Sequence, residues 1–129
     1  DGVRESVRRS CSGLAAFDLT PARLALLPER DEPRLAAVMT DAPPALMELQ
    51  RRLVQRLVRR AGTAKDNRFV PHITLCRFRE RVPVHPGVLE TMSAGWPAAF
   101  RVESVSLVQS VLKREGPVHT MIERVALGV

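Results

Sequence analysis

The chain has 129 residues, enough for one domain, and its 45% hydrophobic and 26% charged residues are ordinary for a globular protein. This balance argues against disorder, and no apolar run approaches the roughly 20 residues of a membrane helix. The formal net charge is +6, and only Lys65 and Lys113 among the 20 basic residues are lysines. Such arginine-rich usage fits a phosphate-bearing partner and equally fits a GC-rich coding sequence.

The cysteine content indicates the cellular compartment of the protein, and the first residues indicate whether the sequence is a fragment. Cys11 and Cys76 are too few for a disulfide framework or a zinc site, so we expect free thiols and a cytoplasmic location. The three histidines are scattered and no carboxylate stands at ligand spacing, so we expect no metal, and we expect no cofactor. The chain opens on Asp1 without a signal-peptide pattern and is helical almost at once, which favours a fragment or a processed product. We expect a monomer, which could associate if a missing segment leaves a strand edge unpaired.

The first half of the chain predicts a helix, two strands and a long helix. Residues 2–10 read as the end of a helix, and Gly13 follows near its C-terminus. Residues 16–27 are strand-like, with Pro21 marking an edge or a bulge, and residues 34–40 are the partner strand of a hairpin. A helix at about 43–61 follows, with Asp41 as its N-cap and leucines at helical spacing. Its arginines could bind phosphate, but a solvated helix face is favoured.

The second half predicts strands and loops. A polar loop at 63–68 leads to a strand at 69–78, and a Pro/Gly-flanked loop at 84–95 has room for one helical turn. Residues 99–112 alternate as a strand, residues 113–117 form a turn, and residues 118–127 form the last strand. This order predicts one α+β domain over residues 1–129 with a mostly antiparallel sheet and packed helices.

The strand at 69–78 carries the clearest candidate for chemistry. Strand residues two apart point the same way, so His72 and Thr74 share a face. An imidazole can move a proton near neutral pH while a neighbouring hydroxyl binds a phosphoryl oxygen. His-x-Thr is nevertheless a short and common pattern, and spacing alone favours a histidine that is merely satisfied by a neighbour.

Two further residues depend on geometry that the sequence does not give. Arg77 falls on the opposite parity from His72, and only a bulge or the strand's end would turn it to the same face. His119 opens the last strand, with Met121, Glu123 and Val125 on its parity, and would line the same cleft only if that strand lies near the His72 strand. The alternative for His119 is a solvent-exposed end of a hairpin. His85 lies in a Pro-flanked loop and reads as a surface residue.

The stretch Phe-x-Pro-His-Ile-Thr-Leu-x-Arg at residues 69–77 resembles the second signature of the two-histidine (2H) phosphoesterases. The nearest branch is the bacterial RNA 2′,3′-cyclic phosphodiesterases, also called 2′-5′ RNA ligases. The order of elements is similar too: a strand pair, a long amphipathic helix, a polar loop, the signature, then a Gly-Pro turn and a closing strand. The resemblance therefore covers most of the chain.

The resemblance implies a two-lobed α+β domain with a central cleft, in which each lobe supplies one His-x-Thr. It implies metal-independent opening of RNA 2′,3′-cyclic phosphate ends to 2′-phosphates, or 2′-5′ ligation, with one histidine as base and the other as acid. His72 would be the second catalytic histidine and Thr74 would bind the phosphate. Arg77, His119 and Phe69 would contact the substrate or shape the cleft rim. His119 stands where the family commonly has Tyr.

Only one His-x-Thr is present here, and the family's first signature would lie upstream of Asp1. We therefore weigh three hypotheses. The first, which we favour, is a 2H-class phosphodiesterase that acts on RNA ends or cyclic nucleotides and lacks its N-terminal part here. The second is a module of the same fold that binds RNA ends or nucleotides without cutting them. The third is an unrelated α+β domain with a chance match, for which His72 would be buried away from any cleft.

Overall fold

The computed structural model describes residues 2–28, 32–61, 69–78 and 98–128. The described elements are two helices and strands that pair mostly antiparallel, which confirms the predicted α+β class. The predicted loops at 63–68 and 84–95, together with His85, lie outside the described residues. The chain divides into two units, one built from residues 1–17, 43–67 and 101–129 and the other from residues 18–42 and 68–100. Neither described helix is long and apolar enough to cross a membrane.

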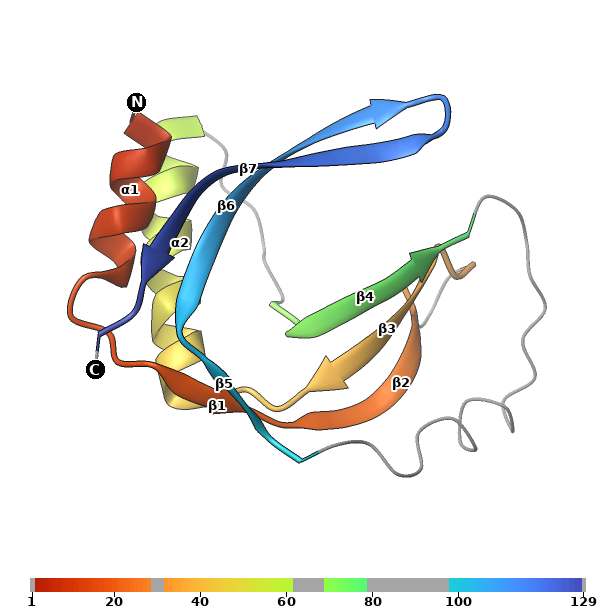
Figure 1. Cartoon of the computed structure of the whole chain (residues 1–129), viewed down its shortest axis with the longest axis horizontal. Helices are drawn as coiled ribbons and strands as arrows, with labels where there is room; N and C mark the ends of the chain where they lie inside the picture. The colour runs from red at the N-terminus through yellow and green to blue at the C-terminus, as the bar shows by residue number, and fades with distance from the viewer. Residues whose placement is uncertain (1, 29–31, 62–68, 79–97, 129) are drawn as a thin grey trace. The chain divides into compact units, whose positions relative to one another are not determined.

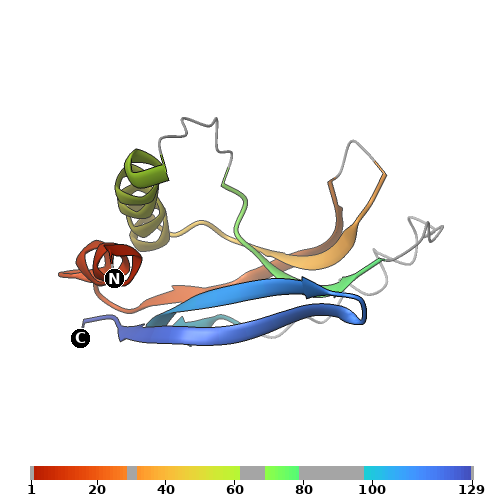
Figure 2. The same ribbon diagram turned by 90° about the horizontal axis from the view of Figure 1, so that it is seen from above.

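The first unit contains two helices and a long hairpin. Helix α1 (Gly2–Cys11) packs against helix α2 (Pro44–Ala61), and its other side contacts strands β6 (Ser104–Lys113) and β7 (Gly116–Ala126). Figure 2 shows α1 between α2 and this hairpin. Val7 and Cys11 on α1 and Leu49 on α2 are buried. Gly13 follows α1 with a φ of 78°, the left-handed conformation that glycine adopts most readily at a helix end.

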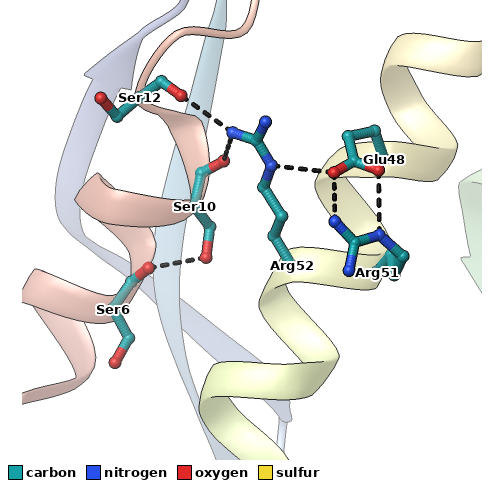
Figure 3. A network of polar contacts seen from close by, with 6 residues as sticks. All are labelled: Ser6, Ser10, Ser12, Glu48, Arg51 and Arg52. Carbon is teal, nitrogen blue, oxygen red and sulfur yellow. Dashed lines mark hydrogen bonds and ion pairs between the residues drawn. The ribbon is translucent and has the colours of Figure 1, made fainter.

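The end of α1 is held by an arginine of α2 (Figure 3). The last carbonyls of a helix have no partner within the helix. One terminal nitrogen of Arg52 donates to the carbonyl oxygens of Ser12, at 2.8 Å, and Ser10, at 3.3 Å. Its Nε donates to Glu48 at 3.0 Å, and Arg51 also donates to Glu48. These two arginines are therefore engaged within the protein, and the part-buried Arg52 does not lie on a solvated face, contrary to the favoured interpretation.

Glu48 makes the free energy of unfolding depend on pH in the acid range. Hydrogen bonds from Arg51 and then Arg52 lower the pKa of Glu48 from 4.5 to about 2. A carboxyl whose pKa is depressed in the folded state stabilises the protein above its unfolded pKa, and this contribution is lost as the pH falls through the folded pKa. We expect Glu48→Gln to be less stable than wild type at pH 6 and the difference to shrink between pH 4.5 and pH 2. Urea unfolding at several pH values measures this, and a difference that stays constant with pH would contradict it.

The second unit contains an antiparallel sheet in the order β2-β3-β4 (Figure 1). Its strands are β2 (Pro21–Leu27), β3 (Leu35–Thr40) and β4 (His72–Arg77). Ala37, Val38 and Met39 of the middle strand are all buried. The register of β2 against β3 shifts between Pro21 and Arg23, which confirms the predicted irregularity at the proline.

Two predicted strands are broken in the structure. The strand expected at 16–27 is divided into β1 (Phe17–Leu19) and β2, and the strand expected at 99–112 into β5 (Phe100–Val102) and β6. At the first break, the backbone N–H of Thr20 donates to the Asp41 carboxylate at 2.8 Å, and Pro21 brings no N–H. Strands β1 and β5 pair with each other as a separate two-stranded sheet.

Other boundaries differ by a few residues. The prediction that Asp41 is the N-cap of α2 is wrong, because Asp41 lies three residues before the helix and its carboxylate accepts a hydrogen bond from Thr20. The predicted turn at 113–117 is only Arg114 and Glu115, and the Gly-Pro pair already belongs to β7. The strand predicted at 69–78 is shorter, since β4 begins at His72.

Candidate functional site

His72 opens β4 and is exposed, with its ring held by the backbone two residues earlier. Its Nδ1 lies 2.7 Å from the carbonyl oxygen of Val70. A carbonyl oxygen can only accept a hydrogen bond, so Nδ1 carries a proton and donates it. The neutral ring therefore has its lone pair on Nε2. Nε2 is thus the atom that can take a proton from a ligand or, once protonated, return one.

The pairing of β3 with β4 contains one irregularity, just after Thr74. Ala37 is opposite Thr74, whereas the next residue of β3, Ala36, is opposite Cys76. Leu75 is therefore an extra residue in β4, which is the arrangement of a β-bulge. Beyond a bulge the alternation of side chains is shifted by one, so faces counted from the sequence are wrong after Leu75.

The bulge changes the face on which Arg77 lies. Directly opposite residues of an antiparallel pair place their side chains on the same face. On β3, the partner of His72 is Met39, the partner of Thr74 is Ala37 and the partner of Arg77 is Leu35. These three β3 residues are spaced two apart, so their side chains lie on the same face. The side chains of His72, Thr74 and Arg77, all of them exposed, therefore share one face of β4, which regular alternation did not allow. Together they offer a proton-transfer group, a hydroxyl and a guanidinium to one ligand.

Phe69 lies in the segment that leads into β4. The Pro71 carbonyl accepts a hydrogen bond of 3.2 Å from the backbone N–H of Thr40 at the end of β3, which ties this segment to the sheet. The Phe69 side chain is 37% exposed, so an apolar ring is available beside the entry of the strand. This position agrees with the rim role that the resemblance implies, and the role itself stays a prediction.

His119 belongs to the first unit and to a different sheet. It lies opposite Ser110 in the β6–β7 hairpin, and its Nδ1 is 2.7 Å from the Ser110 hydroxyl. Among the described strands, β7 pairs with β6 and not with β4, so the pairing that would have brought His119 beside His72 is not present. The sequence predicted the strand that contains Ser110, but it did not predict that Ser110 would be the partner of His119.

The face on which His119 lies also needs correction. Strand β7 contains an extra residue, Ile122, because its register against β6 shifts there. His119 and Met121 share a face, but Glu123 lies on the other face, contrary to the alternation expected from the sequence. There its carboxylate forms an ion pair with Arg8 of α1.

A metal site and a groove that contains candidate site residues are two further possibilities in the described part of the chain. Within it, no three His, Cys, Asp or Glu side chains gather closely enough to hold a metal ion. An open groove lies between α1 and the hairpin of the first unit, and none of its lining residues is a candidate site residue; they are Val3, Arg4, Leu107, Val108, Gln109 and Ile122.

Comparisons with known proteins show what this chain is similar to. A protein named RNA 2′,3′-cyclic phosphodiesterase from Aeropyrum pernix is 28% identical over 124 residues, covering 94% of this chain and 65% of that protein. One of the same name from Thermus thermophilus is 44% identical over 62 residues, covering 48% of this chain and 28% of that protein. The crystal structure of the Thermus thermophilus protein TT0787 matches with a TM-score of 0.79 at 25% identity, covering 96% of this chain and 67% of that one.

The chain therefore spans less than two thirds of the length of either curated relative. The shared fold and the exposed position of His72 contradict the hypothesis of a chance match in an unrelated domain. Residues 1–114, nearly nine tenths of the chain, match the model of the 2′-5′ RNA ligase superfamily, and the chain belongs to that superfamily.

Proposed function

We propose that the protein opens 2′,3′-cyclic phosphates at RNA ends to 2′-phosphates. The observation that carries the proposal is the shared face of His72, Thr74 and Arg77, which the bulge at Leu75 creates. Relatives named RNA 2′,3′-cyclic phosphodiesterase support the substrate class. An arginine fork suits a phosphate, and the formal charge of +6 favours a polyanionic ligand.

The reaction is hydrolysis by a pair of acid and base groups. The oxygen of water attacks the phosphorus in line, the bond from phosphorus to the 3′ oxygen breaks, and the 2′ ester remains. A base takes the proton of the water and an acid protonates the departing 3′ oxygen. His72 supplies one of these groups through Nε2, while Thr74 and Arg77 bind the phosphoryl oxygens. The second histidine would come from a His-x-Thr outside residues 1–129. In 2′-5′ ligation, the 5′-hydroxyl of a second RNA would attack the phosphorus in place of water, with the same bond to the 3′ oxygen breaking.

His119 and Phe69 are proposed to contact the substrate, and no cofactor takes part. Both cysteines are free, which fits the reducing cytoplasm, and we propose that the protein acts there as a monomer.

A module that binds RNA ends without cleaving them is the second candidate. It is favoured by the single His-x-Thr in residues 1–129, because a reaction that needs both an acid and a base would lose most of its rate with one histidine. The two candidates share the same face of β4 and differ in turnover alone.

The test is hydrolysis of a short RNA with a 2′,3′-cyclic phosphate end, by residues 1–129 and by the full product of the gene. We expect the full product to yield a 2′-phosphate. Salt-dependent binding of the RNA without any turnover by either form would establish the binding module instead. Neither turnover nor binding would contradict both candidates.

A further inference from the structure

A proline separates the His72 imidazole from the carbonyl that binds it. The Nδ1 atom of His72 lies 2.7 Å from the carbonyl oxygen of Val70, and Pro71 is the residue between them. The imidazole is exposed, so water competes with this carbonyl for Nδ1. Burial does not hold the ring in place. The hydrogen bond therefore depends on how firmly the backbone keeps the carbonyl and the imidazole together.

Each backbone torsion between the Val70 carbonyl and the His72 side chain has its own restraint. Because peptide bonds are planar, these torsions are φ and ψ of Pro71 and φ of His72. The pyrrolidine ring holds φ of Pro71 at about −65°. The angle ψ sets the direction of the Pro71 carbonyl, which accepts a hydrogen bond of 3.2 Å from the backbone N–H of Thr40. The angle φ of His72 belongs to β4, where His72 is paired with Met39.

This restraint decides which ring nitrogen offers a lone pair to a ligand. A neutral imidazole has two tautomers, and the hydrogen bond made by one nitrogen determines which nitrogen carries the proton. The Val70 carbonyl can only accept, so it keeps the proton on Nδ1 and the lone pair on Nε2. A ring that turned away from the carbonyl would populate both tautomers, and Nε2 would carry the proton in one of them. A residue that keeps the carbonyl in place therefore keeps Nε2 ready to accept a proton.

We propose that Pro71 is a positioning residue, which holds His72 through the Val70 carbonyl in the tautomer that has its lone pair on Nε2. The pyrrolidine ring has no group that exchanges a proton, so Pro71 acts on the reaction through His72 alone. The backbone N–H of Thr40 supports the same arrangement from β3. This inference rests on the proposed function, since the tautomer affects the rate only if a proton is transferred at Nε2.

The test measures the tautomer of His72 in the full product of the gene and in its Pro71→Ala and Pro71→Gly variants. Both variants keep the carbonyl that Thr40 binds, and proline has no N–H to lose. In ¹⁵N NMR at a pH where the ring is neutral, protonated and unprotonated ring nitrogens resonate far apart, and mixing of tautomers brings their signals together. The His72 signals are those that His72→Gln lacks. We expect one tautomer in the wild type, partial mixing with alanine and more with glycine, which leaves φ freest.

The same proteins give the effect on the reaction. We expect Pro71→Ala to lower kcat for a trinucleotide with a 2′,3′-cyclic end about tenfold, the order of the entropy cost of fixing one residue's backbone, and Pro71→Gly to lower it further. KM should change little. Pro44→Ala is the matched control, because it removes the same ring from the exposed first residue of α2 in the other unit. It should change neither the tautomer nor kcat.

The two measurements separate this inference from the proposed function. A lower kcat with the wild-type tautomer in both variants would make Pro71 a merely structural residue and would overturn the inference. Mixed tautomers with an unchanged kcat would overturn it too, as would a wild-type ring whose proton is on Nε2. A wild-type protein that hydrolyses no cyclic phosphate would overturn the proposed function instead, and the NMR measurement would still decide whether Pro71 sets the tautomer of His72.

Discussion

His72→Gln is expected to lower the rate of cyclic phosphate hydrolysis by about 10²–10⁴-fold, the usual size of one lost acid or base group. The amide of glutamine fills a similar space and forms hydrogen bonds, but it cannot exchange a proton near neutral pH. The loss should therefore appear in kcat, with KM little changed. Steady-state hydrolysis of a trinucleotide with a 2′,3′-cyclic end, by the full product of the gene, measures both constants.

A control on the same strand tests whether the face of β4 matters. Cys76 is exposed and lies opposite Ala36, on the face away from His72. Cys76→Ser should keep the activity, and both variants should keep the wild-type far-UV circular dichroism. A His72→Gln protein that is folded and fully active would remove His72 from the mechanism. The shared face of β4 would then be at most a binding surface.

The helices and the middle strands were predictable because their signals are local. In α2, apolar residues recur at helical spacing, and the structure places the helix at Pro44–Ala61 against an expectation of about 43–61. The breaks at Thr20 and Glu103 were not predictable. Each involves a hydrogen bond with a distant segment: Thr20 donates to Asp41, and Leu127 donates to the carbonyl oxygen of Glu103 at 2.8 Å. No local pattern contains that information.

The candidate site shows the same division between local and distant information. The common face of His72 and Thr74 follows from alternation within one strand. The face of Arg77 depends on the bulge at Leu75, and a bulge is defined only against a partner strand. Sequence alone therefore identified the candidate pair His72 and Thr74 but not the face on which Arg77 lies.

Arg52→Met is expected to destabilise the protein by about 2 kcal/mol. Methionine keeps much of the apolar stem but removes the hydrogen bonds to the carbonyls of Ser10 and Ser12 at the end of α1. A hydrogen bond from a charged donor is worth about 1.5–3 kcal/mol, and the Arg52 side chain is only 29% exposed, so solvent replaces it poorly. A cation near a helix C-terminus also interacts favourably with the helix dipole. Urea unfolding followed by circular dichroism measures the loss.

Arg51→Met is the matched control for this prediction. Arg51 is the next residue on α2, binds the same Glu48, and has a side chain that is 54% exposed. In Figure 3 its dashed lines reach Glu48, whereas those of Arg52 also reach the end of α1. Exposed ion pairs contribute little to stability because solvent screens them, so we expect a small loss. Equal losses for the two variants would mean that the bonds to Ser10 and Ser12 add nothing. A larger loss for Arg52→Met would identify this arginine as the polar link that fixes α1 against α2.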